Sequence, residues 1–149
     1  MLFRSLDNSG SMGFAFENGQ SRWDVLSASL AKTLPPIDKT ISLGALVFPA
    51  IGSGRNTCSA PSSLDLAPAL GNVTPLLSLV TQSDPHGGTP TSDALNAAAQ
   101  ALSSLRVGTS ARAMVLATDG APDCNGALDP NSCTCTRGRS EERRVGKEC

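Results

Sequence analysis

The sequence predicts an α/β fold in which a mostly parallel sheet is covered by helices on both faces. Two short apolar runs are typical of strands that are buried on both sides. Amphipathic runs with helix start and stop signals lie between and around them. Strand and helix signals thus alternate along the 149 residues, an order typical of parallel sheets, and a chain of this length suffices for one domain.

The first elements are a strand and a helix. Around Leu6 the sequence predicts the stub of a first strand, whose upstream half is missing. A helix is expected over residues 21–34, because Ser21 suits the N-cap and Asp24, three residues on, completes a variant of the capping box. Pro35 follows, and proline ends a helix.

The middle of the chain predicts a central strand, a loop and a short helix. ISLGALVFP, residues 41–49, is apolar and contains β-branched residues, as a strand buried on both faces requires. Residues 50–71 are rich in Gly, Ser and Pro and predict a loop with a poor edge strand. Residues 74–82 predict a short helix with Pro75 in its first turn.

The clearest helical pattern follows HGG at residues 86–88. Thr89 is expected as the N-cap and Pro90 at the first helical position, and Gly108 is the expected terminator. Residues 111–120, ARAMVLATDG, then predict a second buried strand.

Both ends of the chain resemble translated sequencing adapters. MLFRS at residues 1–5 and RSEERRVGKEC at residues 139–149 match such adapters codon by codon, and segments of this origin are excluded from fold reasoning. The natural domain is therefore expected at residues 6–138, with an ordered core at about 6–123 and a Cys-rich loop at 124–138.

Composition excludes some classes of function. Residues 6–138 hold seven basic and ten acidic side chains, a net charge of −3 with histidine neutral, which argues against nucleic acid as a partner. No apolar run of about 18 residues is present, so the sequence predicts no membrane span.

Four cysteines remain once Cys149 is assigned to the adapter-like end. Cys133 and Cys135 are separated by one residue and would strain to pair with each other, so bridges from Cys58 and Cys124 to that pair are expected, in either of two connectivities. A zinc site usually shows two C-x₂₋₄-C pairs and is the less favoured alternative. Disulfides imply an oxidising compartment.

Polar residues follow the predicted strands at the edge where ligands bind in parallel sheets. Their oxygen atoms are the donors that Mg²⁺, or Ca²⁺ or Mn²⁺, prefers. The predicted metal ligands are Asp7, Ser9, Ser11, Thr89 and Asp119. Two carboxylates would leave the cation able to accept one more anionic oxygen, from a ligand.

Each of these elements has a simpler interpretation. LDNSGSMG is rich in turn-forming residues, Thr89 suits a helix N-cap, and TDG can end a strand. A serine hydrolase is disfavoured because His86 is the single histidine and Ser9 and Ser11 lack a G-x-S-x-G elbow. GSGR at residues 52–55 lacks the pattern of a phosphate-binding loop.

The combination D-x-S-x-S at Asp7, Ser9 and Ser11, GGT ending in Thr89, and TDG containing Asp119 resembles the von Willebrand factor A (VWA) domain with its metal-ion-dependent adhesion site. The resemblance implies a Rossmann-like, doubly wound fold, incomplete here at its C-terminus. It also implies that the five residues bind the cation and that a protein ligand completes the metal shell with an acidic side chain.

The expected function is therefore non-enzymatic: cation-dependent protein binding by an adhesion-type module of a secreted, periplasmic or cell-surface protein, with a lipid anchor in preceding sequence as one option. The alternative is a module of an intracellular metal-chelatase or ATPase-associated complex, where the thiols would be reduced.

Overall fold

The computed structural model describes residues 1–16, 18–51, 57–105, 111–120 and 122 of the chain. It contains a four-stranded sheet with the strand order β3-β2-β1-β4. The predicted α/β class is confirmed, but the sheet is mixed. β1 (Leu2–Asp7) runs parallel to β2 (Leu43–Phe48) and β4 (Ala113–Ala117), whereas β3 (Leu66–Ala69) is antiparallel to β2.

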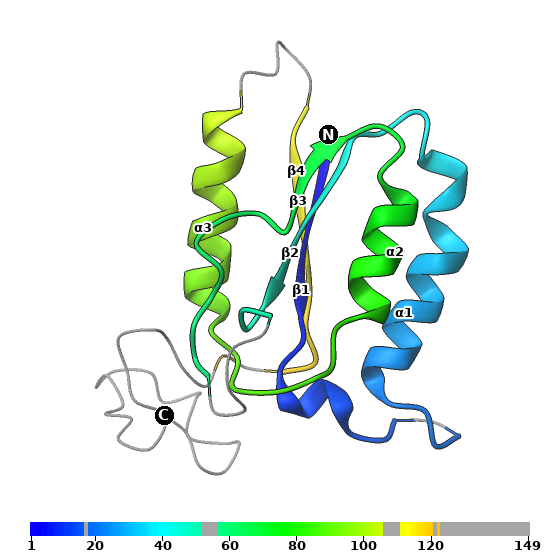
Figure 1. Cartoon of the computed structure of the whole chain (residues 1–149), viewed down its shortest axis with the longest axis vertical. Coiled ribbons are helices and arrows are strands. Elements are labelled where there is room, and N and C mark those ends of the chain that lie inside the picture. Colours follow the sequence, from blue (N-terminus) through cyan, green and yellow to red (C-terminus); the bar gives the residue numbers. More distant parts are fainter. Residues whose placement is uncertain (17, 52–56, 106–110, 121, 123–149) are drawn as a thin grey trace.

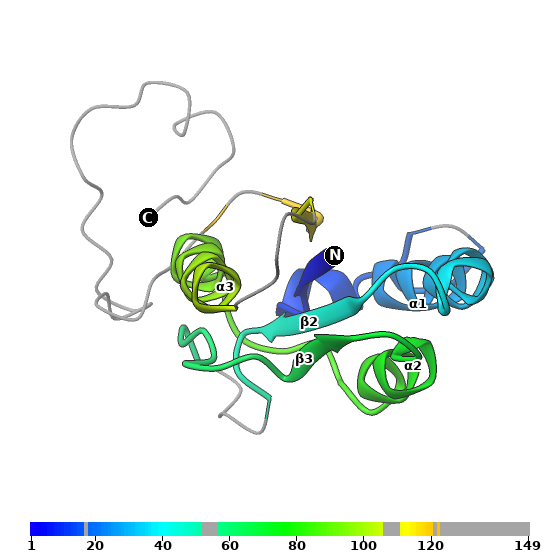
Figure 2. The same ribbon diagram turned by 90° about the horizontal axis from the view of Figure 1, so that it is seen from above.

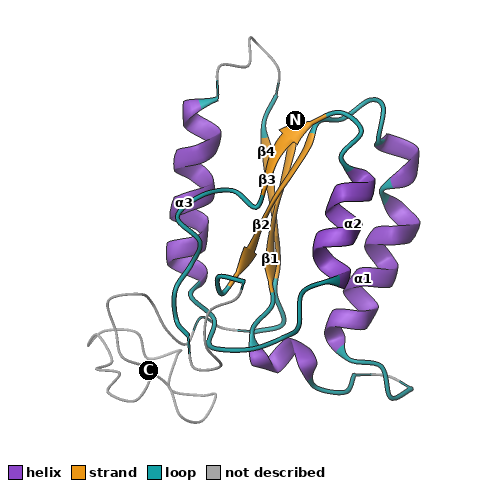
Figure 3. Ribbon diagram, in the orientation of Figure 1, coloured by secondary structure: helices purple, strands orange, loops and turns teal. Residues whose placement is uncertain are grey.

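Helices cover both faces of the sheet (Figures 1 and 3). α1 (Arg22–Thr33) and α2 (Val73–Thr81) pack on one face, and α3 (Thr91–Ser104) packs on the other (Figure 2). Two short 3₁₀ turns, η1 (Gly10–Gly13) and η2 (Pro35–Ile37), precede and follow α1.

Alternation along the strands divides the core into two clusters, one on each face of the sheet. Leu6 and Val47 point toward α1 and α2, whereas Phe3, Leu46 and Phe48 point toward α3. All six residues of β2 are buried, which confirms the prediction of a central strand.

The helix predicted at residues 21–34 is confirmed as α1. The backbone N–H of Asp24 donates to Ser21 Oγ at 3.1 Å, and the backbone N–H of Ser21 donates to Asp24 Oδ2 at 2.9 Å, which completes the capping box. Trp23 secures α1 to α2, because its buried indole N–H donates to the carbonyl oxygen of Val80 at 3.1 Å. The expected short helix and poor edge strand are also confirmed, as α2 and β3.

Two predictions need correction, and a third stays open. Pro90, and not Thr89, occupies the N-cap of α3, and the Pro90 side chain makes no capping hydrogen bond; the predicted terminator Gly108 lies outside the described residues. β4 was expected to be buried, yet Met114, Val115 and Leu116 are 37–38% exposed, because β4 is an edge strand of the sheet that the described residues form. Residues 2–5, which the sequence analysis assigned to an adapter, form the first part of β1. Their adapter origin stays a prediction.

Candidate functional site at the carboxyl edge of the sheet

The carboxyl ends of β1 and β4 bring four of the five predicted site residues together. Asp7 is the last residue of β1, and Asp119 follows β4 by two positions. The Ser9 and Ser11 hydroxyls lie 3.1 Å apart, and Ser11 Oγ donates to Asp119 Oδ1 at 2.8 Å. Residues 108 positions apart in the sequence therefore share one hydrogen-bonded cluster.

Asp7 holds this cluster together through hydrogen bonds to its buried carboxylate. Its carboxylate accepts a hydrogen bond from the Ser9 backbone N–H at 2.9 Å and another from Thr118 Oγ1 at 2.6 Å. The side chain is completely buried. Burial raises the pKa of Asp7, the hydrogen bonds from Thr118 and Ser9 oppose that rise, and the nearby Asp119 charge adds to it.

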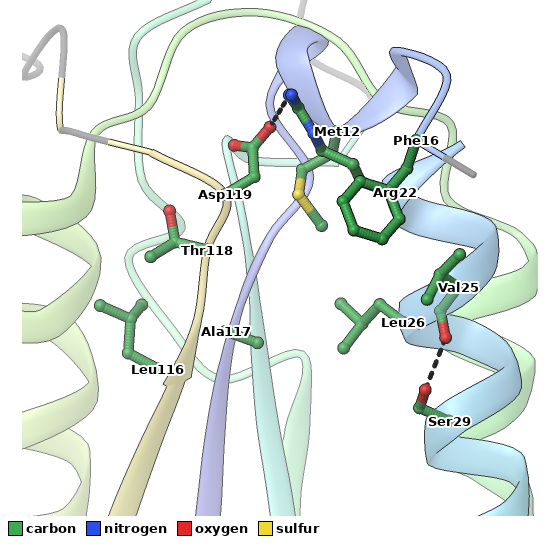
Figure 4. A pocket seen from close by; sticks show the side chains of 10 residues that line it. All are labelled: Met12, Phe16, Arg22, Val25, Leu26, Ser29, Leu116, Ala117, Thr118 and Asp119. Atoms are coloured by element: carbon green, nitrogen blue, oxygen red, sulfur yellow. Dashed lines mark hydrogen bonds and ion pairs between the residues drawn. The ribbon is translucent and has the colours of Figure 1, made fainter. Parts of the chain in front are cut away.

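Arg22, at the start of α1, completes the cluster. Its Nη1 lies 2.6 Å from Asp119 Oδ2 in an ion pair (Figure 4). The same nitrogen donates to the Ser11 carbonyl oxygen at 3.1 Å. The guanidinium therefore compensates one of the two carboxylates. The sequence analysis did not identify Arg22 and Thr118 as residues of this site. The one sequence signal for them is that each is adjacent to a residue already singled out, Ser21 and Asp119 respectively.

The loop that contains Thr89 reaches the same edge through backbone contacts. Gly10 N–H donates to the Gly87 carbonyl at 3.0 Å, and His86 N–H donates to the Asn8 carbonyl at 2.9 Å. Gly87 has a φ of +71°, and a Cβ there would lie 2.7 Å from the Thr57 carbonyl oxygen. The close approach of the backbone at residue 87 to residue 57 therefore requires glycine. Thr89 is buried two residues further on; that its hydroxyl joins the other four residues stays a prediction.

A groove of about 560 Å³ runs from this cluster between α1 and β4 (Figure 4). Met12, Phe16, Val25 and Leu26 line it on the side of α1 and η1, and Leu116 and Ala117 line it from β4. The Arg22–Asp119 ion pair lies in the same groove. The arrangement offers an apolar surface next to a charged one, as protein-binding sites do.

The predicted Mg²⁺ site, with Ca²⁺ or Mn²⁺ as its variants, is wrong. Within the described part of the chain, no group of three or more His, Cys, Asp or Glu side chains is placed to hold a metal ion. Two carboxylates are present in the cluster, and one of them is already paired with Arg22. The predicted oxygen atoms do converge, but they are joined to one another and to a guanidinium by hydrogen bonds.

Two further expectations meet the structure at this point. Cys58 is buried and disulfide-bonded, which confirms a disulfide for this residue, although every other cysteine lies outside the described residues. Of the helices in the described residues, none has the length and apolar character needed to cross a membrane.

Comparisons with known proteins bear on the fold. No family model and no curated protein matches the chain. Among solved structures, the chain is similar to the PilB minor pilin from Streptococcus sanguinis, with 19% identity and a TM-score of 0.58 over 82% of this chain and 30% of that one. An aspartate-to-alanine mutant of the same pilin gives 20% identity and a TM-score of 0.56 over 80% of this chain and 29% of that one.

These structures correct the family expected from the sequence. Both are named minor pilins, and neither is named as a VWA domain, an adhesion-type VWA module or a chelatase subunit, so the predicted VWA family and both functions derived from it are wrong. At about 20% identity the likeness shows the fold alone, and the chain spans less than a third of the neighbours' length. The chain thus has a fold that also occurs in a minor pilin.

Proposed function

We propose that this chain is the extracytoplasmic, protein-binding part of a pilus-associated protein. The observation that carries the proposal is the likeness to the PilB minor pilin structures over about four fifths of the chain. Because the chain spans 29–30% of those structures, the proposal concerns one portion of a larger protein. That the natural domain continues past residue 138, and that a lipid anchor precedes it, are parts of the same proposal.

The disulfide of Cys58 supports an extracytoplasmic location. Disulfides persist in oxidising compartments such as the periplasm and the cell surface, whereas cytosolic thiols are kept reduced. Cys58 is 7% exposed and disulfide-bonded, as a structural bridge would be.

A binding role fits the site better than hydrolysis does. A serine nucleophile needs a histidine within hydrogen-bond reach to accept its proton. Here Ser11 Oγ donates to Asp119, whereas His86 Nδ1 lies 2.7 Å from the Asp84 carbonyl oxygen and His86 Nε2 has no hydrogen-bond partner among the described residues. We therefore propose that the protein is not an enzyme.

The partner surface is proposed at the rim formed by Phe14, Phe16 and Arg22. Phe14 and Phe16 are 63% and 58% exposed, although large aromatic side chains are usually buried. Aromatic and arginine side chains dominate the energetics of protein interfaces. A protein partner that presents an acidic side chain toward Arg22, with apolar groups beside it, would match this rim.

The proposal is tested by binding the purified chain to pili isolated from the organism that carries the gene. Phe16→Ser should weaken binding at least tenfold, because it removes an exposed aromatic anchor beside the groove. Leu70→Ser is the matched control. Leu70 is 57% exposed and directly follows β3. Because β3 runs antiparallel to β2, Leu70 lies at the end of the sheet opposite to the carboxyl end of β2. Absence of binding by the unsubstituted chain would contradict the proposed function.

A further inference from the structure

A short hairpin at residues 14–21, between η1 and α1, presents Phe14 and Phe16 of the proposed partner surface. Within it, Phe16 N–H donates to the Gln20 carbonyl oxygen at 2.8 Å. Near the tip, Asn18 has a φ of +53° and Gly19 has a φ of +78°. Asn-Gly is the dipeptide that tight hairpin turns favour, because both residues tolerate a positive φ.

The Asn-Gly pair at the tip is open. Asn18 and Gly19 are both exposed, and neither forms a hydrogen bond with another described residue. A Cβ added to Gly19 would meet no atom of the described residues within 4 Å, chain neighbours aside. The side-chain amide of Asn18 and the backbone nitrogen of Gly19 are therefore free to approach each other.

Asn8 is held in the opposite way. Its side chain is buried, and its Nδ2 donates to the Asp84 carbonyl oxygen at 2.9 Å. The next backbone N–H, that of Ser9, donates to Asp7 Oδ1 at 2.9 Å. Both the amide of Asn8 and the nitrogen that could attack it are thus occupied. Asn96 lies inside α3, where backbone N–H groups donate within the helix.

Asn72 is held in the same way as Asn8. Its Nδ2 donates to the carbonyl oxygens of Leu43 at 2.7 Å and Ala67 at 2.8 Å. The next backbone N–H, that of Val73, donates to Asp38 Oδ1 at 3.0 Å. Among the asparagines that the structure describes, Asn18 is thus the one whose amide and following N–H both lack such partners.

We propose that Asn18–Gly19 is a site of spontaneous deamidation with water as the co-reactant. The Gly19 backbone nitrogen attacks Cγ of Asn18 and loses its proton, the bond from Cγ to the side-chain nitrogen breaks, and ammonia leaves. Glycine permits this attack because it has no side chain to obstruct the nitrogen. Water then opens the succinimide ring at either carbonyl and gives aspartate or isoaspartate. One water is consumed and one ammonia is released, and no atom is oxidised or reduced.

The conversion changes the hairpin that carries the aromatic residues. Either product places a new carboxylate at the tip, and isoaspartate also routes the main chain through Cγ, which adds one carbon atom to the turn. The hydrogen bond between Phe16 and Gln20 depends on the length of this turn. One consequence rests on the proposed function: a partner that presents an acidic side chain would be repelled by the new negative charge and should bind the converted chain more weakly.

The experiment incubates the purified 149-residue chain at neutral and at mildly alkaline pH and measures released ammonia. Tandem mass spectrometry of tryptic peptides locates each conversion, and an isoaspartyl methyltransferase labels isoaspartate. Asn18 should convert about tenfold or more faster than Asn8 and Asn72, because at those two sites hydrogen bonds must break first. The rate should rise with pH, since the attacking nitrogen loses a proton. No conversion of Asn18, or conversion of Asn8 at the same rate in the folded chain, overturns the proposal.

Two variants test the assignment. Gly19→Ala should convert about tenfold more slowly, because a methyl group obstructs the attacking nitrogen and alanine is strained at a φ of +78°. Asn18→Gln is the control that retains an amide, and it should release no ammonia from this position, since its longer side chain cannot close the five-membered ring. Circular dichroism verifies that each variant is folded. Unchanged conversion in folded Gly19→Ala overturns the proposed attack.

Binding to isolated pili separates this inference from the proposed function. Converted chain should bind more weakly than fresh chain, and Asn18→Gln incubated for the same time should bind like fresh chain. Equal binding of fresh and converted chain overturns the consequence for the partner surface. Failure of fresh chain to bind contradicts the proposed function alone, whereas failure of Asn18 to convert overturns this inference alone.

Discussion

Asp7 combines complete burial with a position in a polar cluster. Its pKa is raised from the ordinary value of 3.8, chiefly by burial, and hydrogen bonds from Thr118 and Ser9 limit the rise. A buried carboxyl group with a raised pKa favours the protonated form, so the folded state binds a proton more readily than the unfolded state does. Its effect on stability is therefore most favourable at low pH and is lost as the pH rises from 3.8 through the folded-state pKa.

Asp7→Asn should flatten the pH dependence of the free energy of unfolding in that window, because the amide does not titrate. Asp65, whose pKa burial also raises, contributes a slope of the same sign, so the slope should decrease without vanishing. Urea unfolding at a series of pH values measures the effect, and Asp84→Asn, at an exposed position, is the control. An unchanged slope in Asp7→Asn would show that Asp7 does not titrate as its burial implies.

At the scale of elements, local signals predicted some boundaries better than others. The capping box of Ser21 and Asp24 placed α1 correctly, because the interaction joins residues three apart and needs no tertiary contact. The same reasoning assigned Thr89 as an N-cap, but α3 begins one residue later, after Pro90. The loop that contains Thr89 is instead positioned by the backbone hydrogen bond between Gly87 and Gly10. Gly10 is distant from this loop in the sequence, so no local pattern indicates the contact.

β2 and β3 depend on a glycine at their contact. A Cβ on Gly44 would lie 2.6 Å from Pro68 Cγ and 3.0 Å from the Leu66 carbonyl oxygen, closer than side chains tolerate. Gly44→Ala should therefore push β3 away and lower the free energy of unfolding by about 1–3 kcal/mol.

Chemical denaturation measures the Gly44 effect. Gly120→Ala is the matched control, because a Cβ at residue 120 would meet no atom of the described residues within 4 Å. Equal stability of the two variants would show that β3 does not hold the position described here.

At the scale of the whole molecule, the two adapter-like ends are expected to contribute differently to the stability of the fold. Residues 2–5 lie in β1, which is paired on both sides, and Phe3 is completely buried among Leu46, Phe48 and α3. Residues 139–149 are predicted to lie beyond the natural domain. The adapter origin of residues 2–5 stays a prediction, and their place in β1 shows that their side chains suit both faces of the sheet.

Removal of residues 139–149 should change the free energy of unfolding by less than about 0.5 kcal/mol, as surface changes do. Removal of residues 1–5 should abolish cooperative unfolding, because it removes most of a strand that pairs with both neighbours. Thermal and urea unfolding followed by circular dichroism test both. A large loss of stability after removal of residues 139–149 would show that the natural domain includes them.

The sequence by itself determined the α/β class, the central strand at residues 43–48 and the capped start of α1, because apolar periodicity and capping act over a few neighbouring residues. It also indicated that Asp7, Ser9, Ser11 and Asp119 would lie together, since the ends of parallel strands share one edge.

Only the tertiary structure decided what that cluster is and which strand is exposed. Arg22 pairs with Asp119 because α1 begins beside the end of β4, a placement that no local pattern encodes. β4 has the composition of a buried strand, yet the strand order puts it at the edge of the sheet within the described part of the chain. Burial and ion pairing depend on which elements become neighbours, and that is settled by packing over the whole chain.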